Sequence, residues 1–331
     1  MAIVGTTVST KKSYGKRFAS LAPDGLLWIL IVAAFFALPD SLLLGSQILV
    51  MVIFVLSLDL LLGVTGIATL GHAAFFGLGA YTAGILASHG WNEPLTGLMA
   101  GGIAAGALGL LSGAVVLRAS GLAQLMLTLA LVFMLYEVAN QASWLTGGAD
   151  GLSGVEIAPL LGFFEFDLFG QTAYVYAAVV LAFSWLLFRQ ISRSPFGHTL
   201  IGVRENPRRM EALGVSVFRF RLAAYLISAV MAGVAGGLLA QTTQYVALNV
   251  VSFELSGAVL VMLILGGTGR GYGAVLGAAI YMIAQDLLSK LDPVFWLFWI
   301  GLILVVVVLL APQGIIGLIS GLFAPKGASD E

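Results

Sequence analysis

The chain has 331 residues, of which 60% are apolar and only 9% are charged, against roughly 25% charged residues in ordinary soluble domains. A soluble fold of this length cannot hide so many apolar side chains, so the composition excludes a soluble protein and indicates that lipid is part of its solvent. The net charge of −1 gives no reason to expect a nucleic-acid partner, and the absence of cysteine excludes disulfides, thiolate metal sites and cysteine nucleophiles.

Ten stretches of the chain are apolar and approach the roughly 20 residues that a membrane helix needs. In chain order they are 25–38, 42–63, 66–87, 95–117, 122–143, 172–188, 222–243, 253–268, 271–289 and 294–311. They predict an all-α fold, a polytopic bundle of about ten transmembrane helices over residues 25–311. We expect a cytosolic N-terminal segment at 1–24 and a cytosolic tail at 312–331. The first stretch is interpreted as a retained helix and not a cleaved signal peptide, because no convincing cleavage site follows it.

The basic residues test this topology. With the N-terminus in the cytosol, ten crossings place every one of the 15 basic residues except Lys290 on the cytosolic side. Cytosolic loops of membrane proteins carry an excess of lysine and arginine, so this asymmetry supports the orientation. The segment 144–171, with four acidic and no basic residues, is the expected outer loop, and the segment 189–221, with seven arginines, is the expected inner loop.

The inner loop contains the signature of a short helix. Asn206 is a good N-cap, Pro207 fits the first helical position, and Gly214 suits the left-handed residue that ends a helix. Residues 207–213 are therefore expected to form a helix about 10 Å long, at 1.5 Å per residue. So short a helix is not stable alone in water, so the membrane domain or a partner must hold it. The alternative is a solvated connector whose cap pattern arose by chance.

The residues of this loop resemble a known family. Arg204-Glu205-Asn206 followed by Glu211-Ala212-Leu213-Gly214 resembles the cytoplasmic loop of ABC importer permeases, in which a short coupling helix sits in a cleft of the ATPase. Residues 66–81, GIATLGHAAFFGLGAY, resemble the G-x-x-S-L-G-H-A-A-F-F-G-x-G-A-Y signature of the LivM branch of branched-chain amino acid (Liv-type) permeases. Residues 146–152 (TGGADGL) and 193–197 (RSPFG) are similar to the outer loop of that family and to the start of its coupling region. The residues at 207–209 depart from the small residues expected there.

The resemblance implies an ABC importer permease of type II-like architecture in a bacterial inner membrane. Its partners would be a homologous second permease, two ATPase subunits and a periplasmic substrate-binding protein. ATP and Mg would be bound by the ATPase, since this chain lacks a phosphate-binding loop and needs no cofactor of its own. The residues expected to contact the ATPase are Arg204, Glu205, Asn206, Met210, Glu211, Ala212, Leu213 and Gly214, with Met210 and Leu213 on one face. Relatives of this kind carry branched-chain amino acids or related small solutes such as amides, urea and aromatic acids.

Polar side chains inside apolar stretches are candidates for the translocation path, because burying them in hydrocarbon is costly. In the stretch 122–143, Gln124 and Thr128 are four residues apart and Glu137 and Asn140 are three apart, so each pair shares a helix face. His72, at the start of a glycine-rich stretch, is the fifth candidate for the translocation path. The competing interpretation is that Glu137 and Asn140 brace helices and that His72 is a hydrogen-bonded structural residue.

Several other features have simpler interpretations. Asp59, Glu254 and Asp286 lie toward the ends of their predicted helices and are expected to be ordinary boundary residues. The glycine cluster 266–273 is expected to form a tight turn between helices. Glycines spaced four apart, at 102/106, 109/113, 233/237 and 273/277, are expected to allow close approach of neighbouring helices, and static packing is favoured over hinge motion.

Two other functional classes remain as alternatives. An ion-coupled secondary transporter would need a charged site near the middle of the membrane among broken helices, and Glu137 and the glycine-rich stretches give this class limited support. An intramembrane enzyme has less support, because the membrane stretches carry no paired carboxylates, no HExxH motif and no serine–histidine pair at helix spacing.

Overall fold

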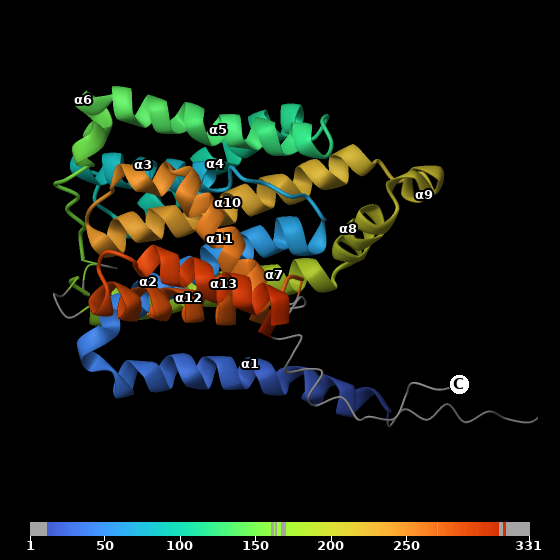
Figure 1. Ribbon diagram of the computed structural model, residues 1–331, viewed down its shortest axis with the longest axis horizontal. Helices are drawn as coiled ribbons and strands as arrows, with labels where there is room; N and C mark the ends of the chain where they lie inside the picture. Colours follow the sequence, from blue (N-terminus) through green and yellow to red (C-terminus); the bar gives the residue numbers. More distant parts are fainter. Residues whose placement is uncertain are drawn as a thin grey trace, which may run out of the picture.

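The structure is a computed structural model that describes residues 12–159, 162, 164–166, 170–269, 271–310 and 314–315. The described residues form helices and no strand, and most of the helices lie side by side in one bundle (Figure 1). The helices are α1 (Lys12–Ala37), α2 (Leu42–Leu58), α3 (Ala73–Ser88), α4 (Pro94–Val116), α5 (Leu122–Gln141), α6 (Ser143–Thr146), α7 (Gln171–Arg193), α8 (Pro195–Glu205), α9 (Pro207–Ala212), α10 (Val217–Thr243), α11 (Phe253–Gly266), α12 (Tyr272–Leu291) and α13 (Trp296–Leu310). Each of the ten predicted stretches overlaps one of these helices over most of its length, so the predicted all-α bundle is confirmed.

Six helices of the described chain are long and apolar enough to cross a membrane. They are α4, α5, α7, α10, α12 and the segment Pro39–Val64, which joins α2 to a short 3-10 turn before it and a wider turn, Asp59–Val64, after it. Three further apolar helical segments are shorter than these six: residues Asp24–Ala37 of α1, α3 and α11. The chain is thus built to cross a bilayer several times.

The first helix starts earlier than expected. The prediction placed residues 1–24 outside the helical bundle, but α1 already begins at Lys12. Hydropathy marks only the part of a helix that lies in lipid, and a helix can continue beyond it. Asp24, near the middle of α1, is buried and ion-paired with Arg189 of α7, and it also accepts a hydrogen bond from Tyr272 of α12. These contacts tie α1 to the bundle.

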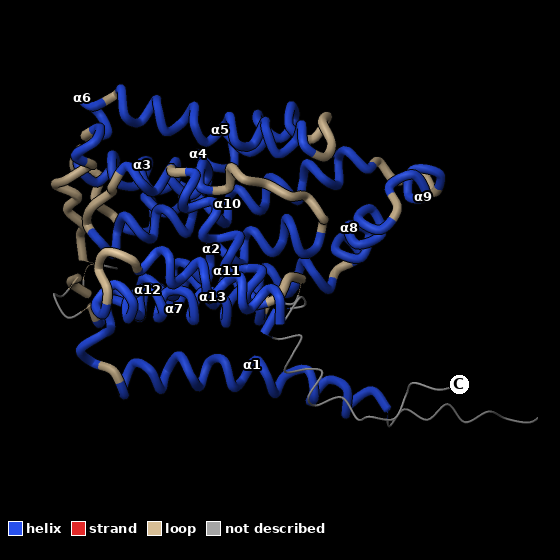
Figure 2. Tube along the Cα trace, in the orientation of Figure 1, coloured by secondary structure: helices blue, strands red, loops and turns tan. Residues whose placement is uncertain are grey.

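The predicted crossing at 66–87 is helical only from Ala73 onward. The preceding residues 65–72 are non-helical and run along the bundle, where Figure 2 shows them as a tan segment among the blue helices. Gly66 has a left-handed backbone (φ 72°), which interrupts the helix. Gly71 packs directly on the backbone of Thr128 in α5, so no side chain fits there. The helical part of the predicted stretch therefore begins seven residues after its expected start at residue 66.

A second interrupted element faces the first. Residues 244–252 follow α10 without forming an α-helix, and α11 then runs for only 14 residues, about 21 Å. The backbone N–H of Ala73 donates to the Ser256 hydroxyl over 3.0 Å, so the first turns of α3 and α11 meet. Two short helices thus begin next to each other inside the bundle.

Glycines allow the close packing of α3, α4 and α10. Gly102, Gly106, Gly109 and Gly113 of α4 all face side chains of α10. Gly233 of α10 packs on Gly101 and Ala105 of α4. Gly273 and Gly277 of α12 contact the backbone of the chain at Gly267 and Met262. The predicted packing role of the four-residue spacing is confirmed, except that Gly237 makes only ordinary contacts.

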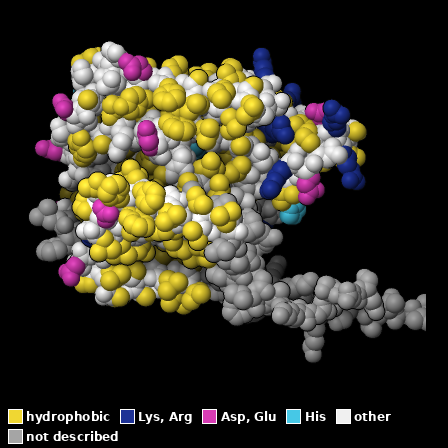
Figure 3. All heavy atoms as spheres, in the orientation of Figure 1, with side chains coloured by type: hydrophobic (Ala, Val, Ile, Leu, Met, Phe, Trp, Pro, Cys, Tyr) yellow, Lys and Arg dark blue, Asp and Glu magenta, His cyan; other side chains and the backbone are white. Residues whose placement is uncertain are grey.

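The two ends of the bundle differ in charge. Lysines and arginines gather at one end, over α8 and α9, whereas acidic side chains lie mostly over the rest of the molecule and at the opposite end (Figure 3). We refer to these as the basic end and the acidic end. Loops 89–93 and 147–159 and the turn after α12 lie at the acidic end, as Figures 1 and 2 show.

Candidate coupling element and translocation path

The basic end carries two consecutive helices, α8 and α9, where the sequence predicted one. The Ser194 hydroxyl accepts the backbone N–H of Gly197 over 3.2 Å and so caps α8, and Pro195 is its first residue. This is the same serine- or asparagine-proline signal that marks α9. Sequence reasoning used the signal at Asn206 and overlooked it at Ser194.

Helix α9 has the predicted caps. The Asn206 side chain accepts the N–H of Arg209 over 3.0 Å, Pro207 occupies the first position, and Gly214 is left-handed with φ 84°. The helix ends at Ala212, one residue before the predicted end. The N-terminal cap, the proline position and the terminating glycine are therefore confirmed as local structure.

The predicted coupling residues form an exposed surface with one exception. Arg204, Glu205, Asn206, Glu211, Ala212, Leu213 and Gly214 are exposed, and Met210 is half-buried. Met210 packs on Gly202 of α8, whereas Leu213 is 71% exposed. Met210 and Leu213 therefore differ in burial, although the backbone N–H of Leu213 still donates to the carbonyl oxygen of Arg209 at the end of α9. Met210 holds α9 on α8, and Leu213 is free to meet another surface.

Arg204 connects this helix pair to the membrane bundle. Its guanidinium donates to the carbonyl oxygen of Gly63, in the wide turn that ends α2, and its aliphatic part packs on Gly66. Gly66 begins the interrupted segment 65–72. A displacement of α8 would therefore be transmitted directly to the turn from which that segment starts.

Asp59 is fully buried in the same turn and is not the boundary residue that its position predicted. Its carboxylate accepts the backbone N–H groups of Gly269 over 2.5 Å and Gly271 over 3.0 Å. Gly267, Gly269 and Gly271 all have positive φ, which confirms the tight turn expected at 266–273. Because this turn folds over Asp59, the backbone supplies the partners that water supplies at a true boundary.

Two of the five predicted path residues brace the interrupted segment. His72 is fully buried, its Nε2 lies 2.8 Å from the Ser57 hydroxyl, and its ring stacks on Phe54. The Thr128 hydroxyl accepts the backbone N–H of Leu70 over 3.2 Å. These contacts fit the structural interpretation given for His72, and they hold residues 65–72 in place.

The other three lie on α5 and are only half-buried or exposed. Glu137 is exposed and accepts a hydrogen bond of 2.7 Å from Gln141, while Gln124 and Asn140 are half-buried. An exposed carboxylate on a helix of this hydropathy is costly in lipid, roughly 2.5–3.5 kcal/mol at the centre of a membrane helix. This face of α5 is therefore suited to water or to another protein chain.

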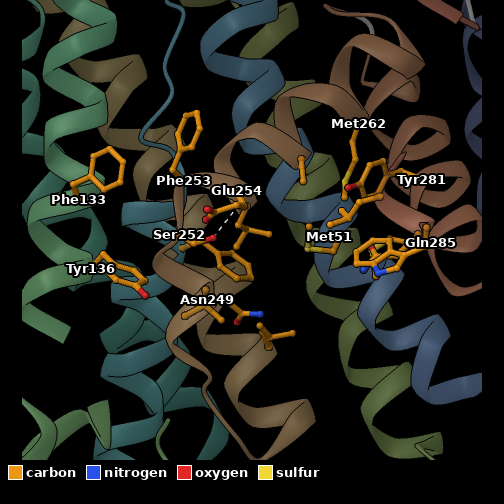
Figure 4. Close-up of a pocket in the computed structure, with 18 residues that line it drawn as sticks. Met51, Phe133, Tyr136, Asn249, Ser252, Phe253, Glu254, Met262, Tyr281 and Gln285 are labelled. Atoms are coloured by element: carbon orange, nitrogen blue, oxygen red, sulfur yellow. Dashed lines mark hydrogen bonds between the residues drawn. The ribbon is translucent and has the colours of Figure 1, made fainter. Parts of the chain in front are cut away.

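A partly open cavity of about 760 Å³ lies beside α5, between it and α11, α12 and α13. None of the five predicted path residues lines it. Polar groups reach it from α5 (Tyr136), from the approach to α11 (Asn249, Ser252), from its first turn (Glu254) and from α12 (Tyr281, Gln285), and most of the other lining residues are apolar. In Figure 4, Tyr136 and Glu254 point into the space between α5 and α11.

Glu254 is the residue that sequence reasoning placed wrongly. It was expected near an outer boundary because the stretch 253–268 was interpreted as a full crossing that begins there. Since α11 is a short helix that begins inside the bundle, its first turn and Glu254 lie against the cavity. The available signal was the acidic residue in a stretch too short to span a bilayer.

Comparison with known proteins identifies the family. Residues 42–310 match the family model described as the permease component of branched-chain amino acid transport systems. The chain belongs to this permease family. The predicted resemblance to the branched-chain amino acid permeases is thereby confirmed, and so is the interpretation of the chain as a multi-pass transport permease.

Named relatives agree with this assignment. The permease is 26% identical to the high-affinity branched-chain amino acid transport system permease protein LivM of Salmonella typhimurium, over 93% of this chain and 80% of the relative. It is 27% identical to LivM of Escherichia coli, over 81% and 68% of the two chains. It is also similar to the guanosine ABC transporter permease protein NupQ of Bacillus subtilis, 28% identical over 44% of each chain. No solved structure gives a significant match.

Proposed function

We propose that this permease is the translocation subunit of an ATP-driven importer in a bacterial inner membrane. Its basic end and both termini face the cytosol. Helices α8 and α9 form the docking surface for an ATPase subunit that binds ATP and Mg. The observation that carries the proposal is the capped helix pair that projects from the basic end, exposed along its coupling residues and tied to the bundle by Arg204. Excess positive charge at that end supports the cytosolic orientation.

The mechanism follows from these contacts. Closure of an ATPase dimer pushes α9, and Met210 passes the movement to α8. Through Arg204 the push reaches the turn at Gly63 and the interrupted segment 65–72, which ends at the start of α3. A rigid element that shifts between two positions in this way accounts for the alternation between inward-open and outward-open states.

The cavity beside α5 forms one side of the proposed translocation path. A homologous second permease forms the other side. The exposed polar face of α5, with Glu137 and Asn140, would then meet the path or the second permease and not lipid. A periplasmic binding protein would deliver the solute to the acidic end. For the substrate we propose branched-chain amino acids or related small solutes, in keeping with the family description.

The proposal is tested by reconstitution with the partner subunits into proteoliposomes. Uptake is expected to require ATP on the α9 side and to persist when ionophores collapse all ion gradients. Uptake that stops with the gradients and ignores ATP would replace the proposal with an ion-coupled secondary transporter, the class that broken helices also suit.

Replacing Gly214 by valine is expected to reduce uptake strongly at equal expression. The φ of 84° costs a β-branched residue roughly 1–2 kcal/mol, so the end of α9 would change its path. Apart from the adjacent residues, no atom lies within 4 Å of the position where a Cβ would stand, so clashes with other parts of the fold add nothing to this local backbone strain. Asparagine, which tolerates the left-handed conformation, is the matched control and should retain most uptake. Normal uptake by the valine variant would contradict a coupling role for this geometry.

A further inference from the structure

Glu254 is the only charged side chain among the described residues that line the cavity. It is exposed to the cavity, and no lysine or arginine of the described chain pairs with it; the ion pairs found there join Arg189 to Asp24 and Lys290 to Asp286. Glu254 therefore gives the cavity a carboxylate that has no ion-pair partner among the residues that the structure describes.

This charge lies well inside the bundle. Glu254 is in the first turn of α11, which meets the first turn of α3 through the hydrogen bond from Ala73 to Ser256. From that point α3 runs for 16 residues toward the acidic end and α11 for 14 toward the basic end. An unpaired carboxylate at such depth marks a functional site by default, because its charge is costly there.

The surroundings define what the carboxylate can bind. Most of the lining is apolar, with aromatic rings from Phe133 and Tyr136 on α5 across from Glu254 (Figure 4). The volume of about 760 Å³ is within the roughly 300–1,000 Å³ of small-molecule sites. In weakly polar surroundings a carboxylate binds an ammonium group through charge-assisted hydrogen bonds and repels anions.

We propose that Glu254 binds the ammonium group of a zwitterionic amino acid in transit, while the apolar wall accommodates an aliphatic or aromatic side chain. The inference rests on the proposed import function and narrows its substrate class. Among amino acids, amides, urea and aromatic acids, it selects the amino acids and excludes the anionic aromatic acids.

The test uses the complete importer in proteoliposomes, with L-leucine, 4-methylpentanoate, urea and benzoate as probes, alongside the ligand that mass spectrometry finds on the cognate binding protein. L-Leucine and 4-methylpentanoate share an aliphatic chain and differ in the ammonium group. Only solutes with an ammonium group are expected to accumulate. Glu254→Gln should lower initial amino acid uptake at least about 10-fold, the loss expected when a hydrogen bond between charged groups is removed.

Two controls separate charge from folding. Glu254→Asp keeps the charge and should retain more uptake than Glu254→Gln. Asp286→Asn removes a carboxylate of α12 that is paired with Lys290 and lies outside the cavity lining, and it should leave uptake unchanged. ATP hydrolysis stimulated by the loaded binding protein reports assembly and should persist in Glu254→Gln.

The outcomes are distinct for the two proposals. ATP-driven import of a solute without an ammonium group, or unchanged amino acid uptake by Glu254→Gln, overturns the role of Glu254 and leaves the import function standing. A wild-type complex in which no solute moves on ATP overturns the import function itself.

Discussion

Replacing Gly236 by alanine is expected to prevent stable folding of the bundle. A Cβ at this position would lie far inside contact distance of the Phe76 carbonyl oxygen and 2.9 Å from the backbone nitrogen of Ala80. Both obstacles are backbone atoms of α3, so no side-chain rotation relieves them. Overpacking of cores costs roughly 1–3 kcal/mol even where side chains can adjust, and here whole helices must separate. We expect loss of the monodisperse peak in detergent and a much lower unfolding temperature.

The adjacent Gly237 provides a matched control. Its nearest neighbour would be the Ala83 Cβ at 3.5 Å, an ordinary van der Waals contact. Alanine also favours a helix over glycine by about 1 kcal/mol. Gly237→Ala is therefore expected to be as stable as the wild type or more stable. Equal losses at the two neighbouring positions would mean that α3 and α10 do not pack as described.

Replacing Leu213 by aspartate is expected to abolish ATP-driven uptake while the permease itself remains folded. Leu213 is 71% exposed, so the bundle loses no packing when it changes. A docking surface does lose its apolar contact, and a carboxylate buried at the interface adds a desolvation cost. Association with a tagged ATPase should fall at least about 10-fold, which is 1.4 kcal/mol of binding free energy, with no change in the unfolding temperature of the isolated permease.

Leu291→Asp is the matched control, because it makes the same leucine-to-aspartate change at an exposed position away from α9. Leu291 is also an exposed leucine at a helix end, 79% exposed, but it ends α12 between Lys290 and Asp292 and away from α9. We expect normal ATPase association for this variant. If Leu213→Asp binds the ATPase as well as Leu291→Asp does, the docking surface lies elsewhere.

The positions of the helices along the chain were predictable wherever a long apolar run is enough to specify a membrane helix. Apolar runs such as 122–143 and 172–188 coincide with most of α5 and α7, because lipid requires an internally hydrogen-bonded backbone. The caps of α9 were predictable because asparagine, proline and glycine act locally. The start of α3 was not, because residues 65–72 leave the helix through the left-handed Gly66 and find hydrogen-bond partners such as Thr128 that are distant in sequence.

For the candidate path too, local sequence patterns were informative and contacts between distant parts of the chain were not predictable. Helical spacing pointed to polar residues on α5, and the structure places two other residues of that helix in the cavity, Phe133 and Tyr136, the second of which precedes the predicted Glu137 in the sequence. Glu254 could not be assigned by spacing, because its importance depends on where α11 begins. Asp59 was interpreted as a boundary residue for a similar reason, since its partners Gly269 and Gly271 are more than 200 positions away in the chain.

The sidedness of the bundle decides whether α9 can meet an ATPase, and thiol labelling measures it directly. The chain has no cysteine, so single cysteines at Glu211 in α9 and Glu156 in the loop before α7, both exposed, can be labelled specifically. With a membrane-impermeant maleimide on intact spheroplasts, the Glu156 position is expected to react at once and the Glu211 position only after the membrane is opened. Immediate labelling at Glu211 together with protection at Glu156 would place the basic end outside the cell and contradict the coupling role of α8 and α9.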